Sequence, residues 1–382
     1  MVFALKVSKK DLKQIKSLIR NVPEIYQSIY IDEELIAQGC RDNEKERLNA
    51  IQNYFQDNQV VCDIGSNAGF FVIELAKRYK NSIFISIELD KDYASLQAKL
   101  IEVNNLKNII LINGSISLDW LCRARNSCIY FDVCMMLSVV HHMPFPKEFI
   151  DGISNISREM ILEIASSEEE NVCGKDKSKL VKEQDIISLK QQGFELDYQS
   201  SIHTDHTKKR KFFYCKDDNH IRKVFYPYID YIDSHQKGYE NNKYYLINSD
   251  SKGAFLTKLP KGTTTQLVPG ANISSLSKLG KIYFPYPFLA KKQISLSINK
   301  LLKNHILYDV KPWNIIFSSS GLQLIDYLDN SNPDLKFKSR LDKVVINNFI
   351  DKNFKTLKSI LLWNQLRKFK KLISKRLKIL IS

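Results

Sequence analysis

Residues 60–71 are Val-Val-Cys-Asp-Ile-Gly-Ser-Asn-Ala-Gly-Phe-Phe. The apolar run at 60–64 predicts a short buried strand, and a helical pattern follows over 70–80. Gly65 and Gly69 lie between the two, where a residue without Cβ lets the backbone bend sharply and lets a ligand lie against it. The helix N-terminus adds free N–H groups. A plain strand-to-helix turn is the alternative, and the segments that follow argue against it.

The segments after this turn alternate between strand and helix. Strands are expected at 82–89, 108–112, 160–164, 194–200, 210–216 and from Phe131 into a loop that holds His141 and His142; helices are expected at 9–20, 40–55, 93–104 and 183–192. Strands that alternate with helices indicate a doubly wound α/β sheet with its site at the carboxyl ends of the strands. In the helix over 40–55, the side chains of Arg41, Glu44, Glu46 and Arg47 are expected on a polar side.

Glu88 ends the second expected strand, 23 residues beyond Gly65. In a β-α-β unit, an acidic residue at this point sits beside the glycine turn and can accept hydrogen bonds from ribose hydroxyls. Glu88 is therefore a ligand candidate.

These residues resemble a class I S-adenosylmethionine-dependent methyltransferase over about residues 30–217. The likeness is carried by Asp63, Gly65, Asn67, Gly69, Glu88, Asn104 and the stretch 137–143 (Leu-Ser-Val-Val-His-His-Met), and residues 39–47 (Gly-Cys-Arg-Asp-Asn-Glu-Lys-Glu-Arg) are similar to segments before the first strand of some of these enzymes. The resemblance implies a Rossmann-like methyltransferase sheet and S-adenosylmethionine as the cofactor.

The resemblance also implies a place for individual residues. It puts Gly65, Ser66 and Gly69 at the methionine moiety, Glu88 at the ribose, and Asp63, Asn67 and Leu137 in the same cofactor site. Ser115 and Ile116 are expected at the adenine, although Ser115 stands where many members have an acidic residue. The sulfonium is an activated donor, so positioning supplies much of the rate. His141 or His142 could deprotonate an acceptor hydroxyl, or one of them could merely close the loop below the cofactor.

Composition narrows the class of protein. The 382 residues suffice for about two or three domains, and no apolar run reaches the length of a membrane span. Residues 1–20 lack a continuous apolar core and a cleavage site, so we expect no signal peptide. The seven cysteines, an odd number without C-x-x-C spacing, favour reduced thiols in a cytoplasmic protein and argue against a zinc framework. The pair His203 and His206 is expected in a solvated hairpin, although its spacing would also suit two metal ligands.

The composition changes to Tyr-rich and Asn-rich β segments, such as 243–247 and 254–259, after a polar run at 217–222. This change predicts a methyltransferase domain over 1–219, a compact α+β domain over 220–350, and a tail over 351–382.

Residues 305–317 and 322–327 carry D-x-K-P-x-N and I-D elements that resemble the catalytic and metal-binding loops of the protein-kinase-like superfamily. The resemblance implies Asp309 as the catalytic aspartate, Lys311 as its assistant, and Asn314 with Asp326 as Mg²⁺ ligands; Lys258 is the candidate for binding ATP phosphate. No Asp or Glu lies between Ser251 and Tyr308 to pair with Lys258, which leaves an active kinase and a non-catalytic pseudokinase or scaffold as alternatives.

The formal charge of +15 belongs mainly to the tail, because residues 336–382 carry 14 Lys or Arg and two Asp. Apolar residues recur at Leu362, Leu366, Phe369, Ile373, Leu377 and Leu380, with Arg367, Lys368, Lys370, Lys371, Lys375 and Lys378 on the remaining surface. This pattern predicts a basic amphipathic helix that contacts an anionic membrane or a partner; a helix docked on its own domain or a short coiled coil is the alternative.

A methyltransferase followed by a kinase-like domain is similar to the bifunctional chain terminators of bacterial O-antigen polysaccharides. That likeness implies a glycan or lipid-linked glycan acceptor, and a peripheral site at the inner face of the membrane. The second hypothesis is an RNA methyltransferase whose basic tail binds phosphates.

Overall fold

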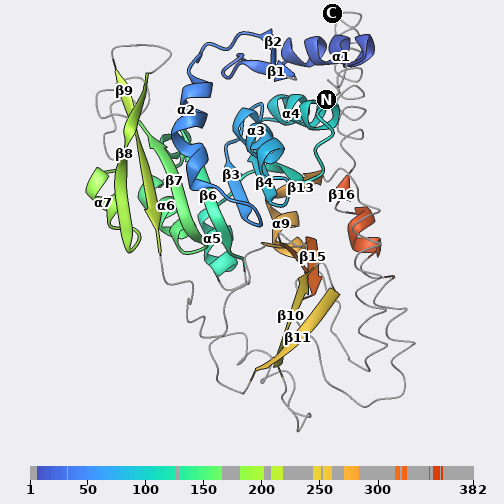
Figure 1. Cartoon of the computed structure of the whole chain (residues 1–382), viewed down its shortest axis with the longest axis vertical. Helices are drawn as coiled ribbons and strands as arrows, with labels where there is room; N and C mark the ends of the chain where they lie inside the picture. The colour runs from blue at the N-terminus through green and yellow to red at the C-terminus, as the bar shows by residue number, and fades with distance from the viewer. Residues whose placement is uncertain are drawn as a thin grey trace, which may run out of the picture.

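The computed structural model describes residues 7–31, 33–125, 129–165, 181–201 and 208–217, and in the second half 244–250, 253–259, 271–283, 315–318, 321–324, 344, 347–352 and 354–355. Nine strands form one mixed sheet in the order β16-β13-β5-β4-β3-β6-β7-β9-β8 (Figure 1). Their bounds are β3 (Val60–Ile64), β4 (Ile83–Glu88), β5 (Ile109–Gly114), β6 (Phe131–Leu137), β7 (Ser157–Ile164), β8 (Gln192–Ser201), β9 (Lys209–Lys216), β13 (Gly280–Tyr283) and β16 (Phe354–Lys355).

The order of the strands fixes the position of the site. Strands β3 to β7 are parallel, and the chain runs outward from β3 through β4 to β5 before it returns to β6 on the other side of β3. The carboxyl ends of β3 and β6 therefore form a topological switch point, where open α/β sheets bind ligands. The expected Rossmann-like sheet is confirmed, with antiparallel β9 inserted between β7 and β8.

Helices cover both faces of the sheet (Figure 1). One core contains side chains from α1 (Lys9–Ile19), α2 (Glu44–Ile51), α3 (Phe70–Arg78) and α4 (Lys91–Val103). The other contains side chains from α5 (Leu118–Arg125), α6 (Pro146–Ser154), α7 (Glu183–Ile187) and α9 (Ile273–Leu279). Neighbours in one strand serve opposite cores, as Val61 and Cys62 of β3 do, because successive side chains alternate across a sheet.

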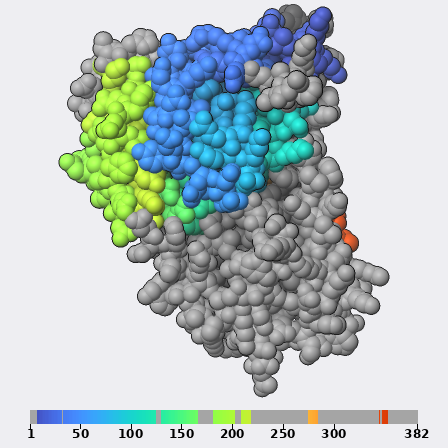
Figure 2. Space-filling view, in the orientation of Figure 1, coloured from blue at the N-terminus to red at the C-terminus, as the bar shows by residue number. Residues whose placement is uncertain are grey.

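The chain before β3 forms a hairpin, β1 (Ile29–Ile31) and β2 (Glu34–Ala37), and then α2. In Figure 2 this blue segment spans the visible face between the green strands and the cyan helices. The sequence predicts four charged side chains on the polar side of a helix over 40–55. Three of them, Arg41, Glu44 and Arg47, are instead buried, at 2%, 1% and 1% exposed, and of the four only Glu46 is exposed. The two arginines are buried because they share an ion pair with Glu163 at the end of β7.

The described part of the second half contains an antiparallel hairpin, β10 (Tyr244–Asp250) and β11 (Gly253–Leu259), at the two segments where the sequence predicts strands. A small sheet holds β12 (Ala271–Asn272), β14 (Ile315–Ser318) and β15 (Gly321–Leu324). β13 pairs antiparallel with β5 and parallel with β16, so both segments extend the sheet of the first half.

The predicted domain limits and the tail helix remain predictions, since residues 356–382 and much of 220–350 lie outside the described residues. Among the described helices, none combines the length and the apolar character that crossing a membrane requires.

Candidate functional site

The turn after β3 depends on its two glycines. Gly65 and Gly69 have φ values of 75° and 87°, in the region that side chains with Cβ rarely adopt. The Gly65 N–H donates to the Ile87 carbonyl at 2.9 Å, which binds the turn to the end of β4. A Cβ added at Gly65 would lie 2.6 Å from Val139 Cγ2, and one at Gly69 would lie 2.6 Å from Gln97 Cγ. Backbone strain and lack of space therefore both require glycine here.

Three buried polar side chains, which hydrogen-bond to one another, support the turn. Ser86 Oγ donates to Ser66 Oγ at 2.7 Å, Ser66 Oγ donates to Gln97 Oε1 at 3.0 Å, and Gln97 Nε2 donates to Ser86 Oγ at 2.6 Å. The first N–H of α3, at Phe70, donates to Gln27 Oε1 of the upstream segment at 3.2 Å. Strand β4, helix α4 and the upstream segment thus hold the turn together.

Glu88 lies beside this turn, as its position predicts. Its Oε2 accepts the Asn67 N–H and its Oε1 accepts the Asp90 N–H, both at 2.7 Å. Burial raises the pKa of Glu88, and these N–H donors oppose the shift. A carboxylate offers about four acceptor positions, so after the backbone N–H groups of Asn67, Leu89 and Asp90 one remains for a ligand hydroxyl.

Asp63 is a second buried carboxylate, in β3. Its Oδ2 has no hydrogen-bond partner among the described residues. Burial, followed by the charge of Glu88, raises the pKa of Asp63 to about 7, against the opposing charge of Arg47. A buried acceptor without a partner is costly, so a cationic or N–H-bearing ligand would complete this site.

The two histidines follow the end of β6. Ser138 has a φ of 61°, and the next residues form a short helix, η2 (Val140–His142). His141 is 7% exposed and His142 is exposed, and their ring centroids are 4.1 Å apart. Burial, then the charges of His142 and Arg210, lowers the pKa of His141 to about 3. Burial and Arg210 also lower the pKa of His142, so both rings are neutral at neutral pH.

A buried charge cluster lies next to this loop. Arg41 and Arg47 each donate to one oxygen of the Glu163 carboxylate, which also accepts from the hydroxyls of Ser138 and Ser200. Burial raises the pKa of Glu163, but the two guanidinium groups outweigh burial and hold the pKa well below its usual range. Two cations face one anion, so the cluster carries a net positive charge.

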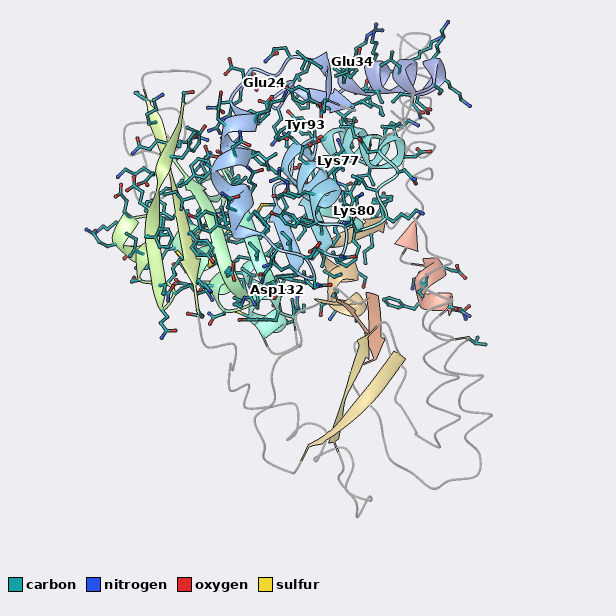
Figure 3. The ribbon with its side chains drawn as sticks, viewed as in Figure 1. Glu24, Glu34, Lys77, Lys80, Tyr93 and Asp132 are labelled. Atoms are coloured by element: carbon teal, nitrogen blue, oxygen red, sulfur yellow. The ribbon has the colours of Figure 1, made fainter. Side chains whose placement is uncertain are left out.

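The upstream segment covers the carboxyl ends of the strands. Tyr93 of α4 donates its hydroxyl to the Glu24 carbonyl at 2.7 Å. Figure 3 shows these two residues at the opposite end of the sheet from Asp132, the second residue of β6. The segment thus closes the edge that holds the glycine turn.

The structure brings together most of the predicted cofactor residues. Asp63, Gly65, Ser66, Asn67, Gly69 and Glu88 meet in one turn and its neighbouring strand ends. Leu137 ends β6; Ser115, which is exposed, and Ile116, which is 8% exposed, follow β5 at the same edge of the sheet. Asn104 follows α4 as its C-cap, and its side-chain amide donates to the Leu100 carbonyl.

Of the five residues that resemble a kinase site, the structure describes one. Lys258 lies on β11 opposite Tyr245. Asp309, Lys311, Asn314 and Asp326 lie outside the described residues, and so do His203 and His206.

Sequence reasoning missed the residues that support the site. These are Gln27, Ser86, Gln97 and Glu163, together with the buried role of Arg41 and Arg47. Glu163 left one signal, an acidic residue near the end of an apolar strand, in the same place that Glu88 occupies in β4.

Comparisons with known proteins give the following likenesses. No protein family model matches the chain. A tRNA (guanine-N(7)-)-methyltransferase of Oceanobacillus iheyensis is 33% identical over 72 residues, which are 19% of this chain. The match covers 34% of that enzyme, so the chain spans about a third of the length of this relative.

Among solved structures, the chain is similar to the bifunctional kinase-methyltransferase WbdD, at 16% identity over 88% of this chain and 87% of that chain with a TM-score of 0.44. It is also similar to the N-terminal domain of EvdMO1 with SAH bound, at 11% identity over 56% of this chain and 100% of that chain with a TM-score of 0.41.

Proposed function

We propose that the chain is an S-adenosylmethionine-dependent methyltransferase. The observation that carries the proposal is the glycine turn at the switch point of the sheet, with Glu88 on one side and the unpartnered Asp63 on the other. The remaining acceptor position of Glu88 suits a ribose hydroxyl, and Asp63 Oδ2 suits the ammonium group of the methionine moiety. The residues therefore fit the cofactor.

The residues on the other side of the turn face the acceptor. S-adenosylmethionine supplies an activated methyl group, so the protein must orient the acceptor and remove its proton. His142 suits the role of base better than His141, because it is exposed and because burial holds the pKa of His141 at about 3, far from neutrality. Ser115, Ile116 and Leu137 complete the proposed cofactor site.

For the second half we propose a kinase-like domain that binds ATP and Mg²⁺ through Lys258, Asp309, Lys311, Asn314 and Asp326. The support is the spacing of these residues in the sequence. We propose a glycan, or another small hydroxyl or phosphate compound, as the methyl acceptor, and an anionic membrane surface as the partner of the basic tail. A non-catalytic pseudokinase that recruits the acceptor is the alternative.

An RNA acceptor is the second candidate. The likeness to a tRNA methyltransferase over 72 residues and the basic charge of residues 336–382 favour it. Contacts with phosphates would make RNA affinity fall steeply with salt, whereas a glycan acceptor predicts no such dependence.

The test is transfer of a labelled methyl group from S-adenosylmethionine. Purified full-length chain is incubated with a lipid-linked glycan fraction and, separately, with total RNA, and a Glu88→Ala variant serves as the control for cofactor use. Label in the glycan fraction that requires Glu88 supports the first proposal, and label in RNA supports the second. Label in neither fraction, together with no binding of the cofactor, would refute the methyltransferase assignment. In parallel, ATP hydrolysis abolished by Asp326→Ala would exclude the pseudokinase alternative.

A further inference from the structure

Ser138 has an unusual backbone for a residue with a Cβ. It follows β6 directly, and its φ of 61° lies in the left-handed region that disfavours side chains. Three contacts hold it there. The Ser138 N–H donates to the Glu163 carbonyl at 3.1 Å, its hydroxyl donates to Glu163 Oε2 at 2.6 Å, and Arg41 Nη1 donates to that hydroxyl at 2.7 Å. Such backbone conformations persist where the surroundings enforce them, and they cluster at functional sites.

The direction of the chain after Ser138 determines where Val139 lies and how the two histidines are oriented. Val139 is placed against Gly65, within 2.6 Å of where a Cβ on that glycine would lie. The chain then turns into η2, with the N–H of His142 donating to the Val139 carbonyl at 3.0 Å, so that His141 is buried and His142 exposed. The backbone conformation of Ser138 therefore fixes both the contact of Val139 with the glycine turn and the positions of the two histidines.

Arg41 connects Ser138 to three other segments. Besides the Ser138 hydroxyl, its guanidinium donates to the Tyr26 hydroxyl at 2.7 Å, to Glu163 and to Ser200. Arg41 is 2% exposed and Glu163 is completely buried. A buried ion pair is weak evidence for a gain in stability, because an apolar replacement often serves as well. The planar fork of arginine does, however, fix the geometry of several acceptors at once.

We propose that Arg41 and Glu163 are positioning residues that hold Ser138 in its left-handed conformation and thereby fix the histidine loop on the acceptor side of the site. The acceptor-side role rests on the proposed methyltransferase function. The positioning itself depends only on contacts within the chain, so the two claims can fail separately.

The first test compares two substitutions that differ by one methyl group. Ser138→Gly and Ser138→Ala both remove the hydroxyl, but glycine adopts a positive φ without strain and alanine does not. The readout is the pH titration of the imidazole C–H resonances of His141 and His142 in full-length protein, assigned with His141→Gln and His142→Gln. Burial lowers the pKa of His141 to about 3, so in the unsubstituted chain we expect no titration of this residue between about pH 5 and 8.

In Ser138→Ala, we expect the loop to relax and the pKa of His141 to rise toward the ordinary value of about 6.5, whereas Ser138→Gly keeps the original titration. The second test compares Arg41→Gln with the double variant Arg41→Gln/Ser138→Gly. The Arg41 charge itself lowers the pKa of His141, so Arg41→Gln raises it in part by removing a charge. The part of the rise that glycine at position 138 reverses is the part due to positioning. Glu163→Gln, which keeps the shape of the side chain, serves if Arg41→Gln does not fold.

Equal titration curves for Ser138→Ala and Ser138→Gly would overturn the proposal, and so would identical His141 titrations in Arg41→Gln and Arg41→Gln/Ser138→Gly. A calorimetric titration with S-adenosylhomocysteine separates the two claims. If the unsubstituted chain does not bind it while the titrations follow the expected pattern, the methyltransferase assignment fails and the positioning contact stands.

Discussion

At the scale of single residues, the two carboxylates beside the glycine turn are prepared for different partners. Glu88 is already held by the N–H groups of Asn67, Leu89 and Asp90 and offers its remaining acceptor position to a hydroxyl. Asp63 has an oxygen without a partner among the described residues and a pKa raised by burial to about 7, which suits a cation. The difference comes from hydrogen bonding, since both side chains are buried.

Replacing Glu88 by alanine should weaken the binding of S-adenosylmethionine about 10- to 100-fold, because a hydrogen bond to a charged group contributes roughly 1.5–3 kcal/mol. Calorimetric titration measures the change. Glu74→Ala is the matched control, since Glu74 pairs with Lys77 on the outer side of α3. An unchanged affinity in Glu88→Ala would show that the ribose is not bound there.

Asp63 should release a proton when the cofactor binds. In the free protein its pKa is about 7, so near neutral pH a fraction of the molecules carries the proton, and an ammonium group beside the carboxylate favours the charged form. Binding should therefore weaken as the pH falls through about 7. Titrations in two buffers of different ionisation enthalpy count the protons. Asp63→Asn should abolish the dependence on buffer, and a buffer dependence that persists in this variant would assign the proton to another group.

At the scale of elements, the strands and helices around the turn follow from the hydrophobic pattern. The apolar run at 60–64 became β3 without a shift, because a strand buried on both faces has a continuous apolar sequence. The helix expected over 40–55 is shorter, Glu44–Ile51, and its Glu44 and Arg47 turn inward while Lys45 and Glu46 are exposed. The pattern could not show this, since the partner of Arg41 and Arg47 is Glu163, more than a hundred residues away. Local periodicity reports exposure only where charges have no distant partner.

The pairing of β13 with β5 could not be predicted from the hydrophobic pattern either, because the two strands are far apart in the sequence. A Cβ on Gly114 would overlap the Leu279 carbonyl, and one on Gly280 would overlap the Asn113 carbonyl, so two glycines allow the close approach. Ser115, expected near the adenine, donates its N–H to the Leu279 carbonyl at 3.3 Å. The second half of the chain therefore supports the adenine side of the proposed site.

Gly280→Val should separate β13 from β5. We expect amides of residues 111–114 to exchange with solvent faster, and the affinity for S-adenosylmethionine to fall, because Ser115 loses its support. Hydrogen exchange followed by mass spectrometry gives the first result. Lys281→Val, at an exposed position of the same strand, is the control. Unchanged exchange in Gly280→Val would contradict the pairing.

At the level of the whole molecule, residues 336–382 contribute both to the fold of the sheet and to the positive charge of the chain. Ile350 is packed in a core of the sheet and β16 pairs with β13, so a deletion of 336–382 would damage the fold. Residues 356–382 carry eight Lys or Arg and no Asp or Glu. A truncation after Lys355 is therefore the cleaner way to remove the basic tail.

This truncation should abolish binding to liposomes that contain anionic lipids and leave the binding of S-adenosylmethionine intact, because the proposed site uses no residue beyond 355. Sedimentation with anionic and with neutral liposomes measures the first effect. Salt-dependent RNA binding lost on truncation, with no liposome binding by the full chain, would instead favour the RNA acceptor.

The glycine turn beside Glu88 is proposed to bind a methyl donor, and the decisive experiment is calorimetric titration of the full-length chain with S-adenosylmethionine. Gly65→Arg is the paired variant, since its φ of 75° and the nearby Val139 leave no room for a side chain. We expect saturable binding at one site by the unsubstituted chain and none by Gly65→Arg, with thermal unfolding used to show that the variant is folded. No binding by the unsubstituted chain, or equal binding by the two proteins, would contradict the proposal.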